Sequence, residues 1–600
     1  MSHRMTTRSR EERPAAALVA PASAAGATRY RAADRLLLRA ARHGGPWVGA
    51  LALAALASAA GALALPAVLG RAVDAVIVDG APGPWLIWLA LLLGLLAGAE
   101  ALNSFAGGAA IARSTAWLRH TLWHHVLAME RDSADRYTRG DLASRIVGNA
   151  AQAGRVAPDM VRATASLIPA VGGTVALALI DPWLCVTFVA GLPVLVVAMR
   201  ALTRDASDVA TGYLAVQGTI AGRLVEAMTG GRTIAAAGTV RREIGRVLAP
   251  LPELRRHGLG MWRTQMRITA QDVLTVSLLK IAVLAVAGAQ LARGRITPGE
   301  MLAASQYVTL ATSIGSSLTT MARLARSRGG AARLAEVLGE PRLQYGTARL
   351  PEGRGRLELR GVTARAGGRP VLEAIDLVVP AGSLAAVVGH TGAGKSLLAA
   401  LVGRLKDPEE GEIVLDGVPL RQLAHDELRA AVAYGFERPA LIGGTLADVI
   451  AFGADAPRTD DLVAAAYAAQ ADGFIRRFPE GYRTPLPDAP MSGGEIQRLG
   501  IARAFAHAGR VLVLDDVAAS LDTVTEHHIS RVLATAFVDR TRIVVAHRSS
   551  TAARADFVIW LDDGVVRAVA PHDRLWDEPD YRALFGPAWP AGAAVAGRTA

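Results

Sequence analysis

Residues 389–396 read GHTGAGKS and fit the phosphate-binding loop pattern G-x-x-x-x-G-K-[ST]. Glycines in this pattern let backbone N–H groups approach phosphate oxygens, while the lysine reaches the β and γ oxygens and the hydroxyl residue ligates Mg²⁺. Apolar residues predict a strand over 384–388 and a helix from 397, so a helix N-terminus also faces the anion. The predicted phosphate site comprises Gly389, His390, Thr391, Gly392, Ala393, Gly394, Lys395, Ser396 and Leu397.

A second element lies about a hundred residues later, where residues 491–495 read MSGGE and the apolar residues 511–514 lead into two aspartates. With these motifs the chain resembles the ATP-binding cassette (ABC) superfamily, whose signature is LSGGQ. The resemblance implies that this signature caps the γ-phosphate held by the opposite subunit, so that a nucleotide site needs two cassettes. The predicted signature residues are Met491, Ser492, Gly493, Gly494 and Glu495.

Two more motifs follow in the family's order. Residues 519–522 read ASLD and resemble the D-loop, with Asp522, and residues 544–548 read VVAHR and resemble the strand of the switch histidine, His547. The resemblance implies ATP and Mg²⁺ as cofactors, with Ser396, Glu437 and Asp515 as metal ligands. It implies catalytic roles for Asp516, His547 and Glu437. Five motifs in sequence over about 160 residues make the resemblance specific.

The departures from the family pattern concern catalysis. Asp516 stands where the family has a glutamate that orients the attacking water, and Glu437 stands where the family has the Q-loop glutamine. Ala366 replaces the aromatic residue that stacks on adenine. A misplacement of about 1 Å at a reacting centre can cost on the order of 10²-fold in rate. We therefore expect Mg-ATP to bind and to be cleaved slowly, unless a backbone shift compensates for the shorter Asp516.

Hydropathy divides the chain into a membrane part and a soluble part. Mean hydropathy is +0.29 although 20% of residues are charged, and the long apolar runs lie before residue 325. Stretches near the ~20 residues that span a bilayer predict six helices: Trp47–Leu69, Trp85–Phe105, Val161–Ile180, Trp183–Leu202, Val273–Leu291 and Met301–Arg323. The predicted fold class is an α-helical six-span transmembrane domain followed by an α/β P-loop ABC ATPase domain.

This order of domains resembles an ABC exporter half-transporter, in particular the degenerate-site subunit of bacterial heterodimeric exporters. Residues 140–145 and 224–238 resemble its two intracellular coupling loops. The predicted domains are an N-terminal extension with an elbow helix (1–45), the transmembrane domain (46–335), a linker (336–352), the nucleotide-binding domain (353–585) and a flexible tail (586–600). No cleavable signal is expected before residue 47.

Charge and cysteine content restrict location and partners. Arginines are concentrated in the N-terminus and the long loops. By the positive-inside rule, we expect a protein of the bacterial plasma membrane whose N-terminus and cassette lie on the cytoplasmic side. The formal charge of +12 is explained by this distribution, and we expect membrane lipids and a second half-transporter subunit as partners, and no nucleic acid. The single Cys185 excludes intrachain disulfides.

The cargo is the least determined part of the prediction. Glu100, Asn103, Asp272 and Lys280 are polar or ionisable groups at or near membrane depth and border a candidate substrate cavity, with internal Asp272–Lys280 pairing as the alternative. Peptide, lipid and secondary-metabolite cargo all stay open. The predicted function is ATP-driven export as half of a heterodimer or homodimer. The alternatives are an importer with the exporter fold, for instance of siderophores, and a non-transporting ATP-regulated membrane protein.

Overall fold

The computed structural model describes residues 22–79, 82–130, 133–134, 136–312, 314–453, 457–507, 509–518 and 521–586. The chain divides into two compact units. The helical unit comprises Met1–His124 and Arg139–Gly339, and the sheet unit comprises His125–Thr138 and Glu340–Ala600. Much of the predicted N-terminal extension and nearly all of the predicted C-terminal tail lie outside the described residues.

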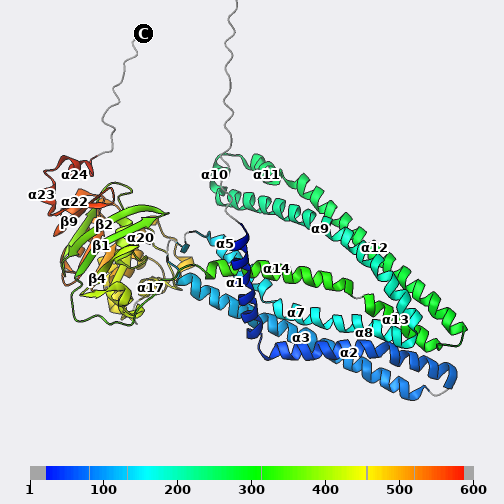
Figure 1. The fold of residues 1–600 in the computed structure, drawn as a ribbon. Coiled ribbons are helices and arrows are strands. Elements are labelled where there is room, and N and C mark those ends of the chain that lie inside the picture. Colours follow the sequence, from blue (N-terminus) through cyan, green and yellow to red (C-terminus); the bar gives the residue numbers. More distant parts are fainter. Residues whose placement is uncertain are drawn as a thin grey trace, which may run out of the picture. The chain divides into compact units, whose positions relative to one another are not determined.

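Long helices build the helical unit (Figure 1). Its elements are α1 (Ala22–His43), α2 (Pro46–Asp74), η1 (Ala75–Asp79), α3 (Gly83–Leu127), α5 (Arg139–Ser144), η2 (Arg145–Asn149), α6 (Ala150–Ala153), α7 (Val156–Ala165), α8 (Leu167–Ile180), α9 (Pro182–Thr229), α10 (Gly231–Ala236), α11 (Val240–Leu248), α12 (Leu251–Ala292), α13 (Pro298–Thr312) and α14 (Ile314–Leu338). Helices α9 and α12 run side by side over most of their length.

All six predicted spans lie on helices. Within the described residues, four helical stretches are long and apolar enough to cross a membrane: Pro46–Ile77, Gly83–Leu127, Arg139–Ile180 and Val240–Ala292. They contain the first, second, third and fifth predicted spans. The fourth begins in the shorter apolar helix Pro182–Pro193, and the sixth is divided between α13 and α14. The count of six therefore stays a prediction.

The ends of neighbouring helices are tied by buried or half-buried polar groups. Asp181 occupies the predicted tight turn between α8 and α9, where its Oδ1 accepts a hydrogen bond from the Trp183 N–H at 2.8 Å and caps α9. The amide of Gln290, on α12, donates to the same oxygen at 3.3 Å. Such pairing is required because an unsatisfied polar group at membrane depth costs several kcal/mol.

An ion pair between α7 and α14 was not anticipated from the sequence. Asp159 is buried, and its Oδ1 lies 3.4 Å from Nε of Arg323. The two residues are more than 150 positions apart, so only the packing of α14 on α7 brings them together. The pair gives Arg323, at the end of the sixth predicted span, a partner inside the helical unit.

The predicted elbow helix corresponds to the second half of α1. Ala33, Leu36, Leu37 and Ala40 form its buried face, and α1 packs along α14. The guanidinium of Arg328 on α14 binds both carboxylate oxygens of Asp34, at 2.8 and 2.7 Å. This helix is therefore docked onto the bundle through one apolar face and one bidentate ion pair.

Short helices occupy both predicted coupling loops. Helix α5 covers residues 139–144, and α10 lies within the stretch 224–238. Arg145, directly after α5, pairs with Asp141 at 2.8 Å and with Glu336 of α14 at 3.1 Å. These contacts fix the first loop within the helical unit. Docking of either loop on a cassette stays a prediction.

Two sheets form the frame of the sheet unit. One is antiparallel, in the order β2 (Arg369–Val379), β1 (Leu357–Ala366), β4 (Glu410–Leu415), β5 (Val418–Pro419). The other has the order β10 (Val565–Ala570), β9 (Phe557–Asp562), β3 (Leu384–Val388), β8 (Thr541–Val545), β7 (Val511–Leu514), β6 (Val432–Gly435), and all its neighbours are parallel except β10 and β9.

Helices and short turns surround these sheets (Figure 1). They are α15 (Lys395–Val402), η3 (Leu420–Gln422), α16 (His425–Ala431), α17 (Leu446–Ala451), α18 (Thr459–Ala468), α19 (Asp472–Ile475), η4 (Gly481–Arg483), η5 (Leu486–Asp488), α20 (Gly493–Ala506), α21 (Thr523–Thr535), α22 (Ser549–Ala552), α23 (His572–Leu575) and α24 (Pro579–Ala583). Strands β3, β7 and β8 are buried along their whole length, as expected for parallel strands covered on both faces.

Helices α2 and α13 cross in close contact at two glycines. A Cβ added to Gly299 would lie 2.0 Å from the carbonyl oxygen of Gly70. The N–H of Gly299 also donates to Oδ1 of Asp74 at 2.7 Å, and the Thr297 hydroxyl donates to its Oδ2 at 2.6 Å. Small residues at a crossing allow membrane helices to approach this closely.

We expect Gly299→Ala to lower the apparent thermal unfolding midpoint of the purified chain, because the added methyl group meets backbone atoms that must move apart. Overpacking of this kind typically costs about 1–3 kcal/mol. Gly288→Ala on α12 is the matched control, since a Cβ there meets nothing within 4 Å. Equal midpoints for the two variants would contradict the close crossing.

Candidate nucleotide-binding site

The chemistry-bearing residues of the sheet unit lie at one edge of the parallel sheet. Strand pairing sets Val387 beside Val545, Val544 beside Leu514, and Leu514 beside Gly435. The four strands β3, β8, β7 and β6 therefore end together. The phosphate loop follows β3, the switch histidine follows β8, the aspartate pair follows β7 and the Q-loop glutamate follows β6. Ligands of open parallel sheets bind at this carboxyl edge.

The phosphate loop is held in an anion-binding conformation. Gly389 has φ +155°, and a Cβ there would lie 2.2 Å from the carbonyl oxygen of Leu561, so only glycine fits. Lys395 opens α15 and is buried, with Nζ donating to the carbonyl oxygens of Gly389 at 2.8 Å and His390 at 3.0 Å. Its ammonium thus lies inside the loop that it closes, where it is positioned to meet a bound phosphate.

Asp515 and Ser396 are brought together across the sheet edge. The Ser396 hydroxyl donates to Oδ1 of the buried Asp515 at 2.8 Å, and the Tyr434 hydroxyl donates to Oδ2 at 3.1 Å. A hydroxyl and a carboxylate are hard oxygen ligands that suit Mg²⁺, which is usually held by few protein groups plus substrate phosphates. Among the residues described, no three His, Cys, Asp or Glu side chains are grouped to hold a metal alone. The donor set therefore fits Mg²⁺ bound with a nucleotide.

Asp516 pairs with the switch histidine. Its Oδ2 lies 3.4 Å from Nε2 of His547, and its backbone adopts φ +48°, a left-handed conformation that aspartate tolerates better than most residues. Burial raises the pKa of Asp516; His547 acts against this, while the negative charges of Glu437 and Asp515 add to it. The side chains of Asp516 and His547, with Glu526, Ser530 and Thr551, line a cavity of about 270 Å³.

Lys395 belongs to the same electrostatic group. Burial lowers the pKa of its ammonium, and the carboxylates of Asp516 and Asp515 act in the opposite direction. The site therefore holds one lysine opposite two aspartates before any nucleotide is present. A bound triphosphate would add negative charge, which the loop N–H groups and a bound cation would balance.

Among the residues described, no hydrogen bond or ion pair joins Glu437 to Ser396 or Asp515. Its side chain is about half exposed and lies 3.5 Å from Nε of Arg438. The backbone around it is fixed by α20, because the Gln497 amide donates to the carbonyl oxygen of Phe436 at 3.1 Å and Arg503 donates to that of Ala440 at 2.9 Å. The structure does not bring Glu437 into the set of oxygens around Ser396, and its role as a metal ligand stays a prediction.

The signature residues form the N-terminus of α20. Ser492 is the N-cap, and its hydroxyl accepts a hydrogen bond from the Glu495 N–H at 3.4 Å. The Glu495 carboxylate in turn accepts from the N–H and the hydroxyl of Ser492 at 2.8 and 2.9 Å, which completes a capping box. These hydrogen bonds lower the pKa of Glu495. Glutamate at this position thus keeps the helix start rigid.

Two other predicted residues have local structural roles. Asp522 caps α21, with Oδ1 accepting from the backbone N–H groups of Val524 at 3.0 Å and Thr525 at 2.9 Å. Ala519 and Ser520 of the D-loop lie outside the described residues. Ala366 ends β1 and is exposed, so the surface that an adenine-stacking ring would provide is missing there.

Three of the four predicted cargo residues have described side chains. Glu100 is exposed on α3, Asn103 is partly buried on the same helix, and Lys280 is partly buried on α12. The side chain of Asp272 lies outside the described part of the chain. Among the residues described, no hydrogen bond or ion pair joins Glu100, Asn103 and Lys280. Their role as a cargo cavity stays a prediction.

Sequence reasoning did not find Tyr434 or Gln497. Tyr434 reaches Asp515 only because β6 pairs with β7 in a register that sets Tyr434 beside Val513. The contact of Gln497 with the carbonyl oxygen of Phe436 depends on how α20 packs on the Q-loop. Neither strand register nor helix packing is encoded in a local motif.

Comparisons with known proteins agree with this geometry. Residues 372–519 match the ABC transporter family and residues 48–314 match the ABC transporter transmembrane region. The ABC transporter ATP-binding protein RamA of Streptomyces coelicolor is 46% identical over 89% of this chain and 84% of that protein. An ATP-dependent lipid A-core flippase of Pseudomonas fluorescens is 30% identical over 82% of this chain and 84% of its own.

Two further comparisons concern a longer relative and a solved structure. A multidrug efflux ATP-binding/permease protein of Mycobacterium tuberculosis is 31% identical over 89% of this chain but 46% of that protein. A solved bacterial Atm1-family ABC exporter with ATP bound shares the fold, with a TM-score of 0.74, 24% identity, and coverage of 90% of this chain and 97% of that one.

The two family matches cover most of the helical unit, the phosphate loop, and strands β3, β6 and β7 of the parallel sheet. Spanning helices, a phosphate loop and an ABC signature in one chain are the parts of a membrane ATPase that couples ATP hydrolysis to transport. The chain therefore belongs to the ABC transporter family, as an exporter-type half-transporter that carries its transmembrane domain and its ATPase domain in one polypeptide.

Proposed function

We propose that this half-transporter forms a heterodimeric exporter in which its own phosphate loop holds Mg-ATP with slow turnover and its signature completes a faster site on the partner. The observation that carries the proposal is the position of Asp516. Its short carboxylate lies on His547 at 3.4 Å, and it stands where a glutamate would reach further toward the water that attacks the γ-phosphate. The Asp516 carboxylate and the His547 ring are thus paired with each other at the sheet edge.

Binding of ATP is supported by the intact half of the site. Lys395 and Ser396 begin α15, and Ser396 already meets Asp515 at 2.8 Å. When bound, Mg²⁺ would supply positive charge between the phosphates, with Ser396 and Asp515 as its protein ligands. Binding needs this charge balance, whereas hydrolysis also needs a base within reach of the water. In the proposed site the residues for charge balance are present, whereas the base for hydrolysis is too short.

The signature supports the second half of the proposal. The capping box between Ser492 and Glu495 holds the first turn of α20 in place, so its N–H groups are arranged before any partner arrives. Anions are stabilised at such a helix N-terminus. A chain that combines a rigid signature with an impaired catalytic carboxylate has the features expected of one subunit in an asymmetric pair.

An amphipathic cargo is supported by the relatives and by α12. The relatives' names refer to a lipid A-core flippase and to multidrug efflux. In the helical unit, an open hollow of about 710 Å³ lies on α12, and its lining is mostly apolar: Trp262, Gln265, Met266, Thr269, Ala270, Val273, Leu274 and Ser277. We place the cargo path along this face, with Glu100, Asn103, Asp272 and Lys280 as its predicted polar groups.

The proposal is tested by the steady-state ATPase rate of the purified chain in lipid, alone and co-purified with the half-transporter encoded next to it. We expect near-zero activity alone and clear activity together, because only the pair contains a competent site. Robust activity of the chain alone would make it a self-sufficient homodimer and overturn the proposal.

Replacement of Asp516 by glutamate probes the same site directly. In a preparation of the chain alone, Asp516→Glu should raise the ATPase rate by on the order of 10- to 100-fold, because the carboxylate regains about 1 Å of reach. Asp516→Asn is the control, since it keeps the shorter length without the charge and should not raise the rate. An unchanged rate in Asp516→Glu would show that the aspartate does not limit hydrolysis.

In the heterodimer, Ser492→Ala should suppress hydrolysis more than Asp516→Asn does, because Ser492 faces the competent site. Loss of this N-cap also costs about 0.5–2 kcal/mol of stability. Thr445→Ala is a matched control, since Thr445 and Asp448 form a second capping box on α17. The order is measured with co-purified pairs, and the reverse order would exclude the assignment of the fast site to the partner.

A further inference from the structure

A buried arginine ends the phosphate-loop helix in a strained backbone conformation. Helix α15 closes with a Schellman motif, in which the N–H of Leu405 bonds to the Ala400 carbonyl at 2.8 Å and that of Arg404 to the Leu401 carbonyl at 2.9 Å. Arg404 has φ +45° at the position where glycine is usual. A non-glycine residue stays in this conformation only where surrounding contacts hold it, and at Arg404 the guanidinium makes such contacts.

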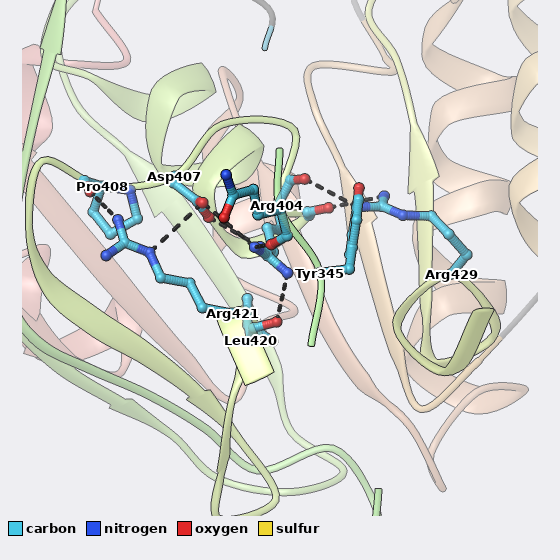
Figure 2. A network of polar contacts seen from close by, with 9 residues as sticks. Tyr345, Arg404, Asp407, Pro408, Leu420, Arg421 and Arg429 are labelled. Carbon is cyan, nitrogen blue, oxygen red and sulfur yellow. Dashed lines mark hydrogen bonds and ion pairs between the residues drawn. The ribbon is translucent and has the colours of Figure 1, made fainter. Parts of the chain in front are cut away.

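The guanidinium of Arg404 binds the linker that precedes β1. Arg404 is 1% exposed, and Figure 2 shows its side chain between Leu420, Asp407 and Tyr345. Nη1 donates to the Leu420 carbonyl at 2.7 Å and Nε donates to Oδ1 of Asp407 at 2.9 Å. Nη2 donates to the carbonyl oxygen of Gln344, and the guanidinium lies 4.7 Å from the centre of the Tyr345 ring.

Tyr345 fixes the linker to the sheet unit from the other side. Its ring meets that of His425 edge to face at 4.8 Å, and Arg429 approaches its hydroxyl at 3.5 Å while donating to the carbonyls of Gly403 and Arg404 at 3.0 Å each (Figure 2). The linker backbone then pairs with residues 422–424 through three hydrogen bonds. Residues 344–348 are therefore held as part of the cassette.

The first residues of the same linker hold the segment that follows α3. Met129 and Arg342 form an antiparallel bridge. The Glu130 N–H donates to the Pro341 carbonyl at 3.4 Å, and the Leu343 N–H donates to that of Ala128 at 3.3 Å. These residues belong to the sheet unit although they follow the second predicted span.

Side chains reinforce this attachment through one glutamate. The carboxylate of Glu340 accepts from the Tyr137 hydroxyl at 2.9 Å and lies 2.8 Å from Nη2 of Arg136. It is largely buried, whereas Arg136 is exposed, so the tyrosine and the arginine satisfy different sides of it. Residues 340–345 thus contact the segment 128–138 at one end and Arg404 at the other.

We propose that Arg404 and Tyr345 form a latch that ties the phosphate-loop helix to the segment 128–138 through residues 340–345. Lys395 and Ser396 lie in the first turn of the eight-residue helix α15, and Arg404 lies two residues beyond its last turn. A short helix moves as a rigid rod, so a displacement of its phosphate-binding end reaches the linker through Arg404. Arg404 is a positioning residue. It transmits the effect of nucleotide binding to the segment that follows the second predicted span.

The test is hydrogen exchange of the full chain in lipid nanodiscs, with and without Mg-ATP. In the wild type we expect Mg-ATP to slow amide exchange of peptides covering 128–138 by about 5- to 10-fold, the low end of coupling between sites. Arg404→Gly and Tyr345→Leu should abolish this difference while ATP affinity, measured with a fluorescent ATP analogue, stays within about 2-fold because neither residue touches the phosphate loop.

The variants are chosen so that folding defects do not decide the result. Arg404→Gly places the preferred residue in the Schellman turn and leaves Asp407 partly exposed, and Tyr345→Leu carries the test if Arg404→Gly unfolds. Tyr345→Phe keeps the ring and should behave as wild type. Arg421→Met is the matched control, since Arg421 lies 3.6 Å from Asp407 without bonding to the linker.

A full exchange difference in folded Arg404→Gly or Tyr345→Leu would overturn the latch, as would the absence of any Mg-ATP effect on residues 128–138 of the ATP-bound wild type. If Arg421→Met also abolished the exchange difference, the role of Arg404 would be no more specific than general packing. That result would also overturn the latch. The readout needs bound nucleotide and no turnover. A high ATPase rate of the chain alone would thus refute the degenerate site, but it would not contradict the latch.

Discussion

The register of four parallel strands is the constraint on which the site depends. Because β3, β8, β7 and β6 end together, loops that are far apart in the sequence begin at the same edge. A change of register would move the aspartate pair away from the phosphate loop and would separate Ser396 from Asp515, which are hydrogen-bonded at 2.8 Å. These strands are buried on both faces, so such a slip would be costly because every side chain would have to repack against new neighbours.

Charge balance at this edge supports the proposal that the site separates binding from cleavage. Lys395 is buried opposite two aspartates, and burial raises the pKa of Asp516 while it lowers that of Lys395. A triphosphate with its cation fits this balance without help from Asp516. In the function proposed above, cleavage requires that the same carboxylate leave His547 and meet a water, and its short side chain makes this difficult. The proposed retention of ATP and the proposed slow turnover then have one physical origin.

Helix α20 and the linker connect the site to the rest of the chain in different ways. Through Gln497 and Arg503, α20 binds the backbone on both sides of Glu437, so hydrogen bonds join the signature helix to the Q-loop. Through Arg404 and Tyr345, the phosphate-loop helix holds the linker. The cassette thus has two separate polar connections from its nucleotide edge, and both rest on arginine or glutamine side chains bound to backbone carbonyls, which tolerate little displacement.

The sequence by itself determined the family, the division into a helical and a sheet part, and the identity of the phosphate-loop, signature and aspartate residues, because each depends on a local motif or on hydropathy. Helices lie at all six predicted spans for the same reason. Only the tertiary structure decided that Tyr434 binds Asp515, that Asp159 meets Arg323, and that Arg404 binds the linker. These contacts join residues from separate elements, and strand register and helix packing, which set them, follow from burial over the whole chain.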